Sequence, residues 1–237
     1  MSEATLYQFS LCPFCNKVRA ALELKGVSYD VVEVAPRDKK ELPPLPEGVK
    51  KKVPVLVAKG ETVVDSTAIL KFIEENFSGT QSLSPKAPEA AQRAEEIEDW
   101  VDETFIQALP TVIYGTRKEA AQAASIIARE SNFTGFQRFK VNVFGSAIMR
   151  QIAKRILKKH GRTDAHAWVS ENVTQFAAWL EDQQFVTGDD VSLADASMHG
   201  AMTCVKDFPV FAKLTEDPKV AAWYERVSGM RAANRAS

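Results

Sequence analysis

Apolar and polar positions divide the chain into an N-terminal part with short β-type runs and a longer part with helical spacing. Runs rich in β-branched and aromatic residues predict strands at residues 5–9, 27–34, 53–58 and 62–64. Helical spacing and end signals predict one helix between Pro13 and Gly26 and another that begins at Asp65. The order is β-α-β, loop, β-β-α, and such an opening predicts a parallel strand pair with a right-handed crossover.

The remainder of the chain predicts helices. Residues 78–88 are rich in Ser, Gly and Pro and form the predicted linker. Beyond it, apolar residues recur at helical spacing in three stripes, and Ser192 with Asp195 is typical of a capping box at a further helix start. The members of the stripes are Ile97, Val101, Phe105 and Leu109; Phe139, Val143, Ile148, Ile152 and Ile156; and Val169, Val173, Phe176 and Leu180. We therefore predict an α/β domain at residues 1–77, a linker at 78–88 and an all-α helical bundle at 89–237.

Composition narrows the possible partners. The formal net charge is -1, which argues against a nucleic acid or an anionic membrane held by bulk charge. Hydrophobic residues make up 45% of the chain, yet no apolar run approaches the roughly 20 residues that a membrane span needs. The N-terminal residues contain an acidic Glu3 and lack a basic segment, so we expect no secretory signal. Three cysteines do not make a disulfide framework, and a cytoplasmic, reducing compartment is expected.

Two of these cysteines form the unit Cys12-Pro13-Phe14-Cys15 at the predicted start of the first helix. Pro13 suits the first helical position, so Cys12 falls at the N-cap, where free N–H groups and the helix dipole favour a thiolate. Cys12 is therefore the candidate nucleophile and Cys15 a candidate resolving thiol, as in thioredoxin-like redox motifs. The alternative is a pair of structural cysteines.

A zinc site is a weaker alternative for the same pair. It needs two more ligands, whereas His160, His166 and His199 are isolated and no second cysteine pair is present. We therefore expect no metal.

Two motifs downstream bear on the cysteine pair. Val53-Pro54 opens a predicted strand, and an X-Pro bond is the kind that can be cis, which would turn the Val53 backbone outward; the alternative is a plain edge-strand proline. Asp65-Ser66 places a carboxylate and a hydroxyl at a helix start, where anions bind well; the alternative is an ordinary N-cap. Together with Cys12, these residues predict a site for a small peptide that carries a thiol.

These three motifs, the linker and the helical remainder resemble the cytosolic glutathione transferases over nearly the whole chain, and the cysteine at the helix start resembles the cysteine-type members. The resemblance implies a thioredoxin-like N-terminal domain and a helical C-terminal domain. A narrower resemblance, in the Cys-Pro-Phe-Cys turn, the Lys-Val-Pro strand start, a Lys- and Arg-rich helix and Trp223-Tyr224, is to the prostaglandin E synthase type 2 branch. Since the sequence begins without a membrane-anchoring extension, we expect the site architecture, not the prostaglandin activity, to be shared.

The resemblance also implies residue roles. Cys12 would be the catalytic thiolate, Val53 would pair its backbone with glutathione next to a cis Pro54, and Asp65 and Ser66 would hold the γ-glutamyl amine and carboxylate. Phe14 would line the sulfur pocket.

Glutathione is then a co-substrate, a small electrophile or a disulfide is the second substrate, and a homodimer is the expected assembly. Three functions stay open: a glutathione-dependent thiol transferase or reductase, a glutathione S-transferase that conjugates electrophiles, and a non-catalytic module that binds glutathione, haem or an iron–sulfur cluster.

Overall fold

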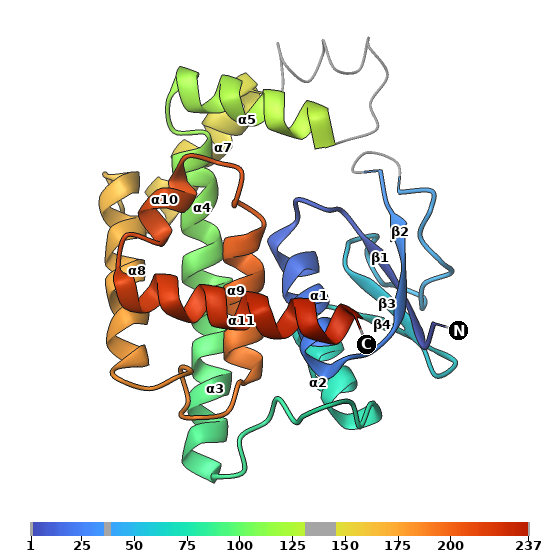
Figure 1. The fold of residues 1–237 in the computed structure, drawn as a ribbon. Helices are drawn as coiled ribbons and strands as arrows, with labels where there is room; N and C mark the ends of the chain where they lie inside the picture. The colour runs from blue at the N-terminus through green and yellow to red at the C-terminus, as the bar shows by residue number, and fades with distance from the viewer. Residues whose placement is uncertain (1, 36–38, 131–145, 237) are drawn as a thin grey trace. The chain divides into compact units, whose positions relative to one another are not determined.

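The computed structural model describes residues 2–35, 39–130 and 146–236 (Figure 1). The chain forms two compact units, each described separately below. The first unit comprises Met1–Asp99, Leu180–Cys204 and Ala222–Ser237, and the second comprises Trp100–Trp179 and Val205–Ala221. The first unit is not continuous in sequence, because two segments from the C-terminal part of the chain, Leu180–Cys204 and Ala222–Ser237, pack with the N-terminal residues.

A four-stranded mixed sheet forms the base of the first unit, in the order β2-β1-β3-β4. Strand β1 pairs in parallel with β2 and antiparallel with β3, and β3 pairs antiparallel with β4. The strands are β1 (Ala4–Gln8), β2 (Tyr29–Glu33), β3 (Val55–Ala58) and β4 (Glu61–Val64). The predicted β-α-β and β-β-α units are confirmed, and the arrangement is thioredoxin-like. Residues 36–38 of the predicted intervening loop lie outside the described residues.

Helix α1 (Pro13–Lys25) crosses from β1 to β2 and is buried along most of its length. Pro13 opens it, and Gly26 ends it with a φ of 70°, a left-handed conformation that glycine adopts without a Cβ clash. The N–H of Val27 donates to the Leu22 carbonyl at 2.9 Å and closes the last turn. Both predicted ends of this helix are therefore confirmed.

Helices α2, α3 and α9 also belong to the first unit. Helix α2 (Ser66–Asn76) follows β4, and helix α3 (Pro88–Trp100) begins where the predicted linker ends. Helix α9 (Leu193–Thr203) packs along α1 at very short range, since a Cβ on Gly200 would lie 2.5 Å from the Lys17 backbone nitrogen. Glycine is needed at position 200 because any side chain would separate the two helix backbones.

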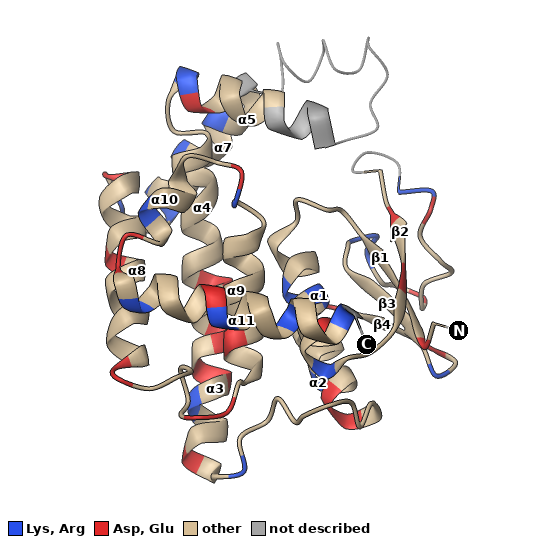
Figure 2. Ribbon diagram, in the orientation of Figure 1, with Lys and Arg blue, Asp and Glu red and all other residues tan. Residues whose placement is uncertain are grey.

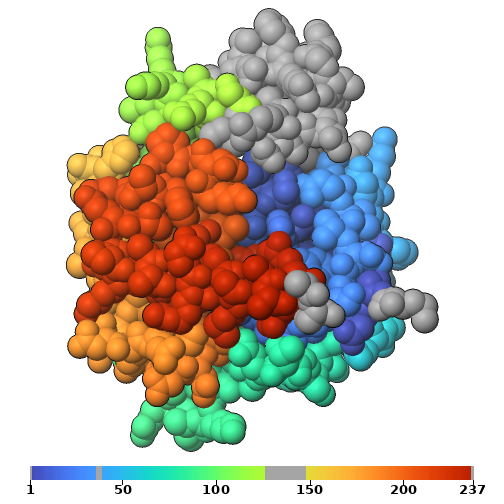
Figure 3. All heavy atoms as spheres, viewed as in Figure 1, coloured from blue at the N-terminus to red at the C-terminus, as the bar shows by residue number. Residues whose placement is uncertain are grey.

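The C-terminal helix α11 (Pro218–Ala236) contributes its second half to the first unit. Basic residues recur along this helix (blue in Figure 2), and two of them, Arg231 and Arg235, bond the buried Glu23 of α1. The space-filling view shows the red atoms of α11 lying against the blue atoms of the N-terminal residues (Figure 3). Two side chains near the end of the chain thus join its first helix.

The second unit is helical. Its members are η1 (Val101–Phe105, a π-helix), α4 (Ile106–Ile113), α5 (Arg117–Glu130), α7 (Ser146–Lys159), α8 (Ala165–Leu180) and α10 (Val210–Leu214). Helix α4 continues through Pro110, and the π-helical turn precedes this proline. All members of the first and third predicted stripes are buried.

The second predicted stripe was wrong as a core face. Ile148 is 59% exposed and Ile152 36% exposed, whereas Ala153 is buried. Helix α7 packs against α4 and α5 through a face offset from the isoleucines, because the small Ala153 faces inward. Phe139 and Val143, the other early members of this stripe, lie outside the described residues.

Candidate thiol site

The candidate site begins at a tight turn between β1 and α1. The backbone N–H of Cys12 donates to the Phe9 carbonyl at 2.9 Å, which closes the turn. Cys12 then adopts an extended conformation, with φ −81° and ψ 123°, and Pro13 begins the helix. Cys12 is therefore the N-cap residue, as predicted, but its side chain makes no capping hydrogen bond to the helix.

The two thiols of this turn are in different environments. Cys15 is fully buried and Cys12 is half-buried, and both are free thiols. A hydrogen bond from the Cys15 side chain lowers the pKa of Cys12; burial opposes this, and the backbone N–H groups of Cys15 and Phe14 lower the pKa further. Burial is the main cause that raises the pKa of Cys15, and the neighbouring Cys12 raises this pKa further. The arrangement favours a Cys12 thiolate beside a protonated Cys15.

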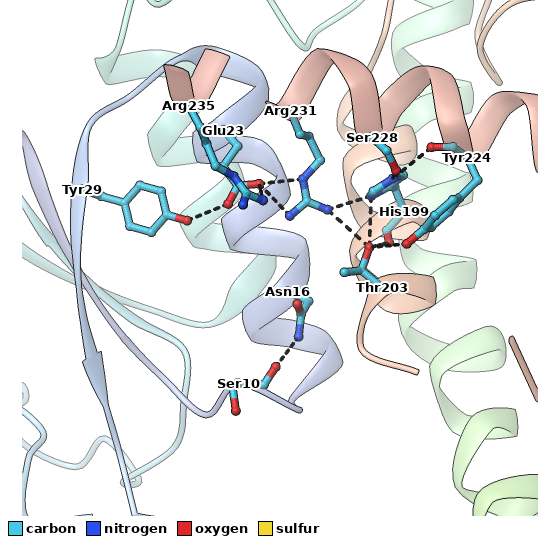
Figure 4. A network of polar contacts seen from close by, with 10 residues as sticks. All are labelled: Ser10, Asn16, Glu23, Tyr29, His199, Thr203, Tyr224, Ser228, Arg231 and Arg235. Carbon is cyan, nitrogen blue, oxygen red and sulfur yellow. Dashed lines mark hydrogen bonds and ion pairs between the residues drawn. The ribbon is translucent and has the colours of Figure 1, made fainter. Parts of the chain in front are cut away.

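Side chains that the sequence did not indicate hold the turn in place. Glu33, at the end of β2, accepts a hydrogen bond from the Ser10 backbone N–H at 2.6 Å. On the other side, the buried Asn16 amide donates to the Ser10 carbonyl at 2.8 Å (Figure 4) and to the Cys12 carbonyl at 3.0 Å. The backbone beside the thiol is thus fixed from both a strand and the helix.

The registers of the sheet bring the three predicted motifs to one edge. Tyr7 pairs with Val55, and Val55 pairs with Val64, so the end of β1, the start of β3 and the end of β4 share a row. The Cys12 turn follows β1, Val53-Pro54 precedes β3, and Asp65-Ser66 follows β4. The structure therefore gathers these motifs although they span more than 50 positions of the sequence.

The Val53–Pro54 peptide bond is cis. Pro54 is buried and Val53 is half-buried. Among the described residues, the backbone N–H and carbonyl of Val53 have no hydrogen-bond partner. A donor and an acceptor are thus left for an extended peptide at this edge of the sheet.

Asp65 is the N-cap of α2. Its Oδ1 accepts hydrogen bonds from the backbone N–H groups of Thr67 at 3.1 Å and Ala68 at 3.2 Å, so the capping interpretation is confirmed. Its φ of 76° is a strained value for a residue with a Cβ, and such strain clusters at functional sites. Ser66 follows as the first helical residue and is buried, and its hydroxyl and N–H have no hydrogen-bond partner among the described residues.

A buried ion pair between α1 and α3 also contacts the start of α2. Lys17 of α1 is fully buried and pairs with Glu98 of α3, and the Thr67 hydroxyl donates to the same carboxylate at 3.0 Å. Thr67 lies next to Ser66, and Lys17 lies two positions after Cys15. No local sequence pattern could indicate this link, because Lys17 and Glu98 are 81 positions apart.

At the other end of α1, a second buried network is fully bonded (Figure 4). Glu23 accepts hydrogen bonds from Arg231 and Arg235 at 2.6 Å each and from the Tyr29 hydroxyl at 2.8 Å. Burial alone would raise the pKa of Glu23, but the two guanidinium groups outweigh it and hold the pKa below its usual value. Burial and the Glu23 charge raise the pKa of Tyr29 to about 12.

The same network fixes the protonation state of His199. Arg231 is within 2.7 Å of Nδ1 of His199, and because a guanidinium only donates, this nitrogen is an acceptor. The proton is then on Nε2, which faces the Tyr224 carbonyl and the Ser228 hydroxyl. Burial and the Arg231 charge hold the pKa of His199 well below its usual range. His199 is therefore a neutral structural histidine.

A cavity lies between α2 and α3, and the thiol turn is not part of its walls. Its volume is about 300 Å³, and its walls come from α2, from α3 (acidic positions red in Figure 2) and from Leu193 and residues 83–85. Thr67 and Glu98 line it, whereas Cys12, Val53 and Ser66 do not. We therefore assign the candidate chemistry to the turn rather than to this cavity.

Neither a metal-binding cluster nor a membrane-spanning helix is found among the described residues. No group of three or more His, Cys, Asp or Glu side chains that could hold a metal ion is found among them. Within the same residues, each helix is too short or too polar to cross a membrane.

Comparisons with known proteins identify the class. Residues 6–81 match the N-terminal domain of glutathione S-transferases, and residues 158–230 match their C-terminal domain. The two matches together span more than half of the chain. The chain therefore belongs to the glutathione transferase superfamily and is a glutathione transferase-type protein.

The relatives refine this class. The chain is 28% identical to prostaglandin E synthase 2 of Danio rerio, over 94% of this chain and 70% of that protein. It is 27% identical to prostaglandin E synthase 2 of Mus musculus, over 95% of this chain and 69% of that protein. A probable glutathione S-transferase of Nicotiana tabacum is 42% identical, over 37% of this chain and 39% of its own length. Both resemblances noted in the sequence are thereby confirmed.

Solved structures support the fold. Beta-etherase LigF from Sphingobium sp. strain SYK-6 superposes with a TM-score of 0.68 at 21% identity, covering 96% of this chain and 98% of that chain. The theta class glutathione S-transferase of Xanthomonas axonopodis pv. citri, solved with glutathione bound, has a TM-score of 0.64 at 17% identity, covering 100% and 99%. The predicted fold, a thioredoxin-like domain followed by helices, is confirmed.

Proposed function

We propose that this protein is a glutathione-dependent thiol transferase or reductase that works through Cys12. The observation that carries the proposal is the inequality of the two thiols at the start of α1. The pKa of Cys12 is lowered by the Cys15 side chain, whereas burial raises the pKa of Cys15 itself. Because the thiolate is the reactive form of cysteine, the half-buried Cys12 is the nucleophile.

The chemistry is two successive thiol–disulfide exchanges. The Cys12 thiolate attacks the glutathione sulfur of a mixed disulfide, the substrate S–S bond breaks, and the released thiolate takes a proton from solvent. The enzyme then holds glutathione through a Cys12 disulfide. A second glutathione thiolate attacks the glutathione sulfur of that disulfide, which releases oxidised glutathione and restores the Cys12 thiolate.

Cys15 offers another route for the second step. Its thiolate would attack the Cys12 sulfur and release glutathione, leaving a disulfide between the two cysteines. The raised pKa of Cys15 makes this attack slow near neutral pH. We therefore propose that Cys15 acts mainly as the hydrogen-bond donor to Cys12, and that external glutathione resolves the intermediate.

Glutathione binding is proposed along the sheet edge. The unpartnered Val53 backbone would pair with the cysteinyl residue of glutathione, which leads its sulfur towards Cys12. The Ser66 hydroxyl and N–H would bind the γ-glutamyl carboxylate at the positive end of α2. Asp65 uses Oδ1 for its cap, so Oδ2 is left for the γ-glutamyl amine. Phe14 follows the thiol and would line the sulfur pocket.

Conjugation of glutathione to an electrophile is the second candidate function. The 42% identity to a probable glutathione S-transferase of Nicotiana tabacum, over an 88-residue alignment, favours it. In that case glutathione would supply the nucleophile and Cys12 would be a neighbour. We do not extend the proposal to prostaglandin synthesis. The 28% identity to prostaglandin E synthase 2 supports a shared architecture and no more.

The test compares Cys12→Ser and Cys15→Ser with the unaltered protein. Reduction of hydroxyethyl disulfide by glutathione is expected to fall at least about a hundredfold in Cys12→Ser, because the nucleophile is lost, and much less in Cys15→Ser. Glutathione binding, measured by calorimetry, is expected to persist in both. Two outcomes would favour the second candidate instead. One is disulfide reduction by Cys12→Ser equal to that of the unaltered protein. The other is an unaltered protein that conjugates chloro-dinitrobenzene but does not reduce the disulfide.

A further inference from the structure

We propose that Asn16 is a positioning residue for the Cys12 thiol, and that its side-chain amide fixes the turn that presents the sulfur. The inference rests on the proposed function, because it concerns the same nucleophile. It adds a residue outside the Cys-Pro-Phe-Cys motif to the machinery of the site.

The hydrogen bonds of Asn16 are the first support. The amide nitrogen donates to the Ser10 carbonyl at 2.8 Å (Figure 4) and to the Cys12 carbonyl at 3.0 Å. These carbonyls belong to the turn that the Cys12 N–H closes on Phe9. The Cys12 carbonyl also accepts a hydrogen bond from the Asn16 backbone N–H at 3.0 Å, so the contribution particular to the amide is its bond to Ser10, which ties the turn before the thiol to the helix.

Burial is the second support, because it makes the bonds obligatory. Asn16 is only 2% exposed, so its amide cannot exchange these carbonyls for water without cost. The backbone of α9 lies against the backbone of Asn16, since a Cβ on Gly200 would lie 2.6 Å from the backbone carbonyl of Asn16. Asn16 is therefore confined between α9 and the turn.

Asparagine is also a costly choice for this helix position. It is among the poorer helix formers, and its amide commonly competes with the backbone. Here the amide reaches one carbonyl within the helix start and one outside it, which alanine or leucine could not do. The residue type thus fits a role in the turn rather than in helix propensity.

Other titratable groups face the same thiol and stay unchanged in the test. Cys15 lies on α1, Glu33 on β2 holds the Ser10 N–H, and Cys204 follows α9 with its thiol donating to the Ala201 carbonyl. The charge of Cys12 contributes to the raised pKa of Cys204, so these two thiols interact. A change in Cys12 that follows substitution of Asn16 alone is then assigned to the amide.

The experiment measures the rate of Cys12 alkylation by iodoacetamide against pH, with the modified peptide identified by mass spectrometry. Three variants are compared: Asn16→Ala removes both bonds, Asn16→Asp keeps the shape but cannot donate, and Asn16→Ser can back-bond only the Cys12 carbonyl. Asn76→Ala is the matched control, because the Asn76 amide bonds the Phe72 carbonyl at the same four-residue spacing, far along α2.

Alkylation at pH 7 is expected to slow about threefold to tenfold in Asn16→Ala, more in Asn16→Asp and less in Asn16→Ser, with the pH midpoint displaced upward. Asn76→Ala is expected to leave both unchanged. Glutathione affinity should also persist, because the amide of Asn16 bonds Ser10 and Cys12 rather than Val53, Asp65 or Ser66. Unchanged midpoints in Asn16→Asp and Asn16→Ser would overturn the inference. Failure of the proposed function is separately visible, as disulfide reduction that persists in Cys12→Ser.

Discussion

The starts of helices α1 and α9 differ in how their free N–H groups are satisfied. At α9, Ser192 and Asp195 form a reciprocal capping box, and both residues are fully buried. At α1 the N-cap is Cys12, which makes no side-chain capping bond and is half-buried. One helix start is closed by its own side chains, and the other is left open to a charge that forms on sulfur.

The difference shows how the same local feature serves structure in one place and chemistry in another. A capped start lowers the free energy of the folded state, but it leaves no N–H group for a substrate or a thiolate. An uncapped start sacrifices that stability, and here the turn is held instead by Asn16 and Glu33. The start of α2 is intermediate, because Asp65 caps two N–H groups while Ser66 stays free.

Asp195→Ala is expected to have the largest effect on stability, because the Asp195 carboxylate accepts four hydrogen bonds without access to water. The donors are the N–H of Val186 at 3.1 Å, the N–H and hydroxyl of Ser192 at 2.9 and 2.7 Å, and the indole of Trp223 at 2.8 Å. Leaving these donors buried and unpaired should cost about 3–5 kcal/mol in the free energy of unfolding. Urea denaturation followed by circular dichroism measures it.

The matched control is Asp164→Ala, which removes one exposed capping bond, to the N–H of Ala167 at 3.0 Å near the start of α8. About 1 kcal/mol is expected there. Similar losses in the two variants would show that burial adds nothing to the α9 cap. Cys12 alkylation at low temperature should be unchanged in both.

Much of this fold could be predicted from sequence because its signals are local. Strand composition, Pro13, Gly26 and the Ser192–Asp195 spacing each depend on a few neighbouring residues, and each reappears in the structure. The stripe at Ile148 and Ile152 was wrong because periodicity gives a helix face without saying which face packs inward. The packing of Ala153 against other helices decides that, and it is a tertiary effect.

The motifs of the candidate site could be predicted from sequence, but the residues that hold these motifs in place could not. Cys12, Val53-Pro54 and Asp65-Ser66 carry turn and capping signals, and the sheet registers gather them. Asn16 was missed although a helical asparagine four residues after the N-cap is a weak signal for a back-bond. The Glu23–Arg231 pair spans 208 positions, so no local pattern could have indicated it.

Glu23→Gln tests whether the far end of α1 is structural in the same way as the α9 start. Arg231 is buried with this carboxylate, so the substitution should cost about 3 kcal/mol near neutral pH by leaving a buried guanidinium uncompensated. The pKa of Glu23 is lowered in the folded state, so its contribution is present above the unfolded pKa and is lost as pH falls through the folded value.

Stability of the unaltered protein should therefore fall more steeply than that of Glu23→Gln as the pH is lowered from about 5 to 3. Glu216→Gln is the control, because the Lys213–Glu216 pair is exposed and should change little. Parallel pH profiles for the unaltered protein and Glu23→Gln would contradict an ionised, stabilising Glu23.

Cys15→Ala tests the open start of α1 directly. The Cys15 side chain is the largest influence that lowers the pKa of Cys12, so its removal should move the midpoint of Cys12 alkylation up towards the ordinary cysteine value of about 8.5. The rate at pH 7 should fall about threefold to tenfold. The alkylation rate should fall less in Cys15→Ser, because the serine hydroxyl can still donate a hydrogen bond to the Cys12 sulfur. Asn76→Ala is the control, since its amide bonds the Phe72 carbonyl within α2; an equal effect there would point to general loosening.

Cys12→Ser is expected to have the smallest effect on stability, and its sign is the most informative. A serine hydroxyl at an N-cap accepts hydrogen bonds from the helix N–H groups more strongly than the Cys12 sulfur, which makes no capping bond, so the free energy of unfolding should rise by about 0.5–1 kcal/mol. Disulfide reduction is lost in the same variant, and stability gained at the expense of activity is typical of functional positions. Cys204→Ser, a buried control, should instead lose stability because its hydroxyl is poorly accommodated. A Cys12→Ser protein no more stable than the original would mean that the sulfur already satisfies the helix start, and that the open and closed starts differ in chemistry alone.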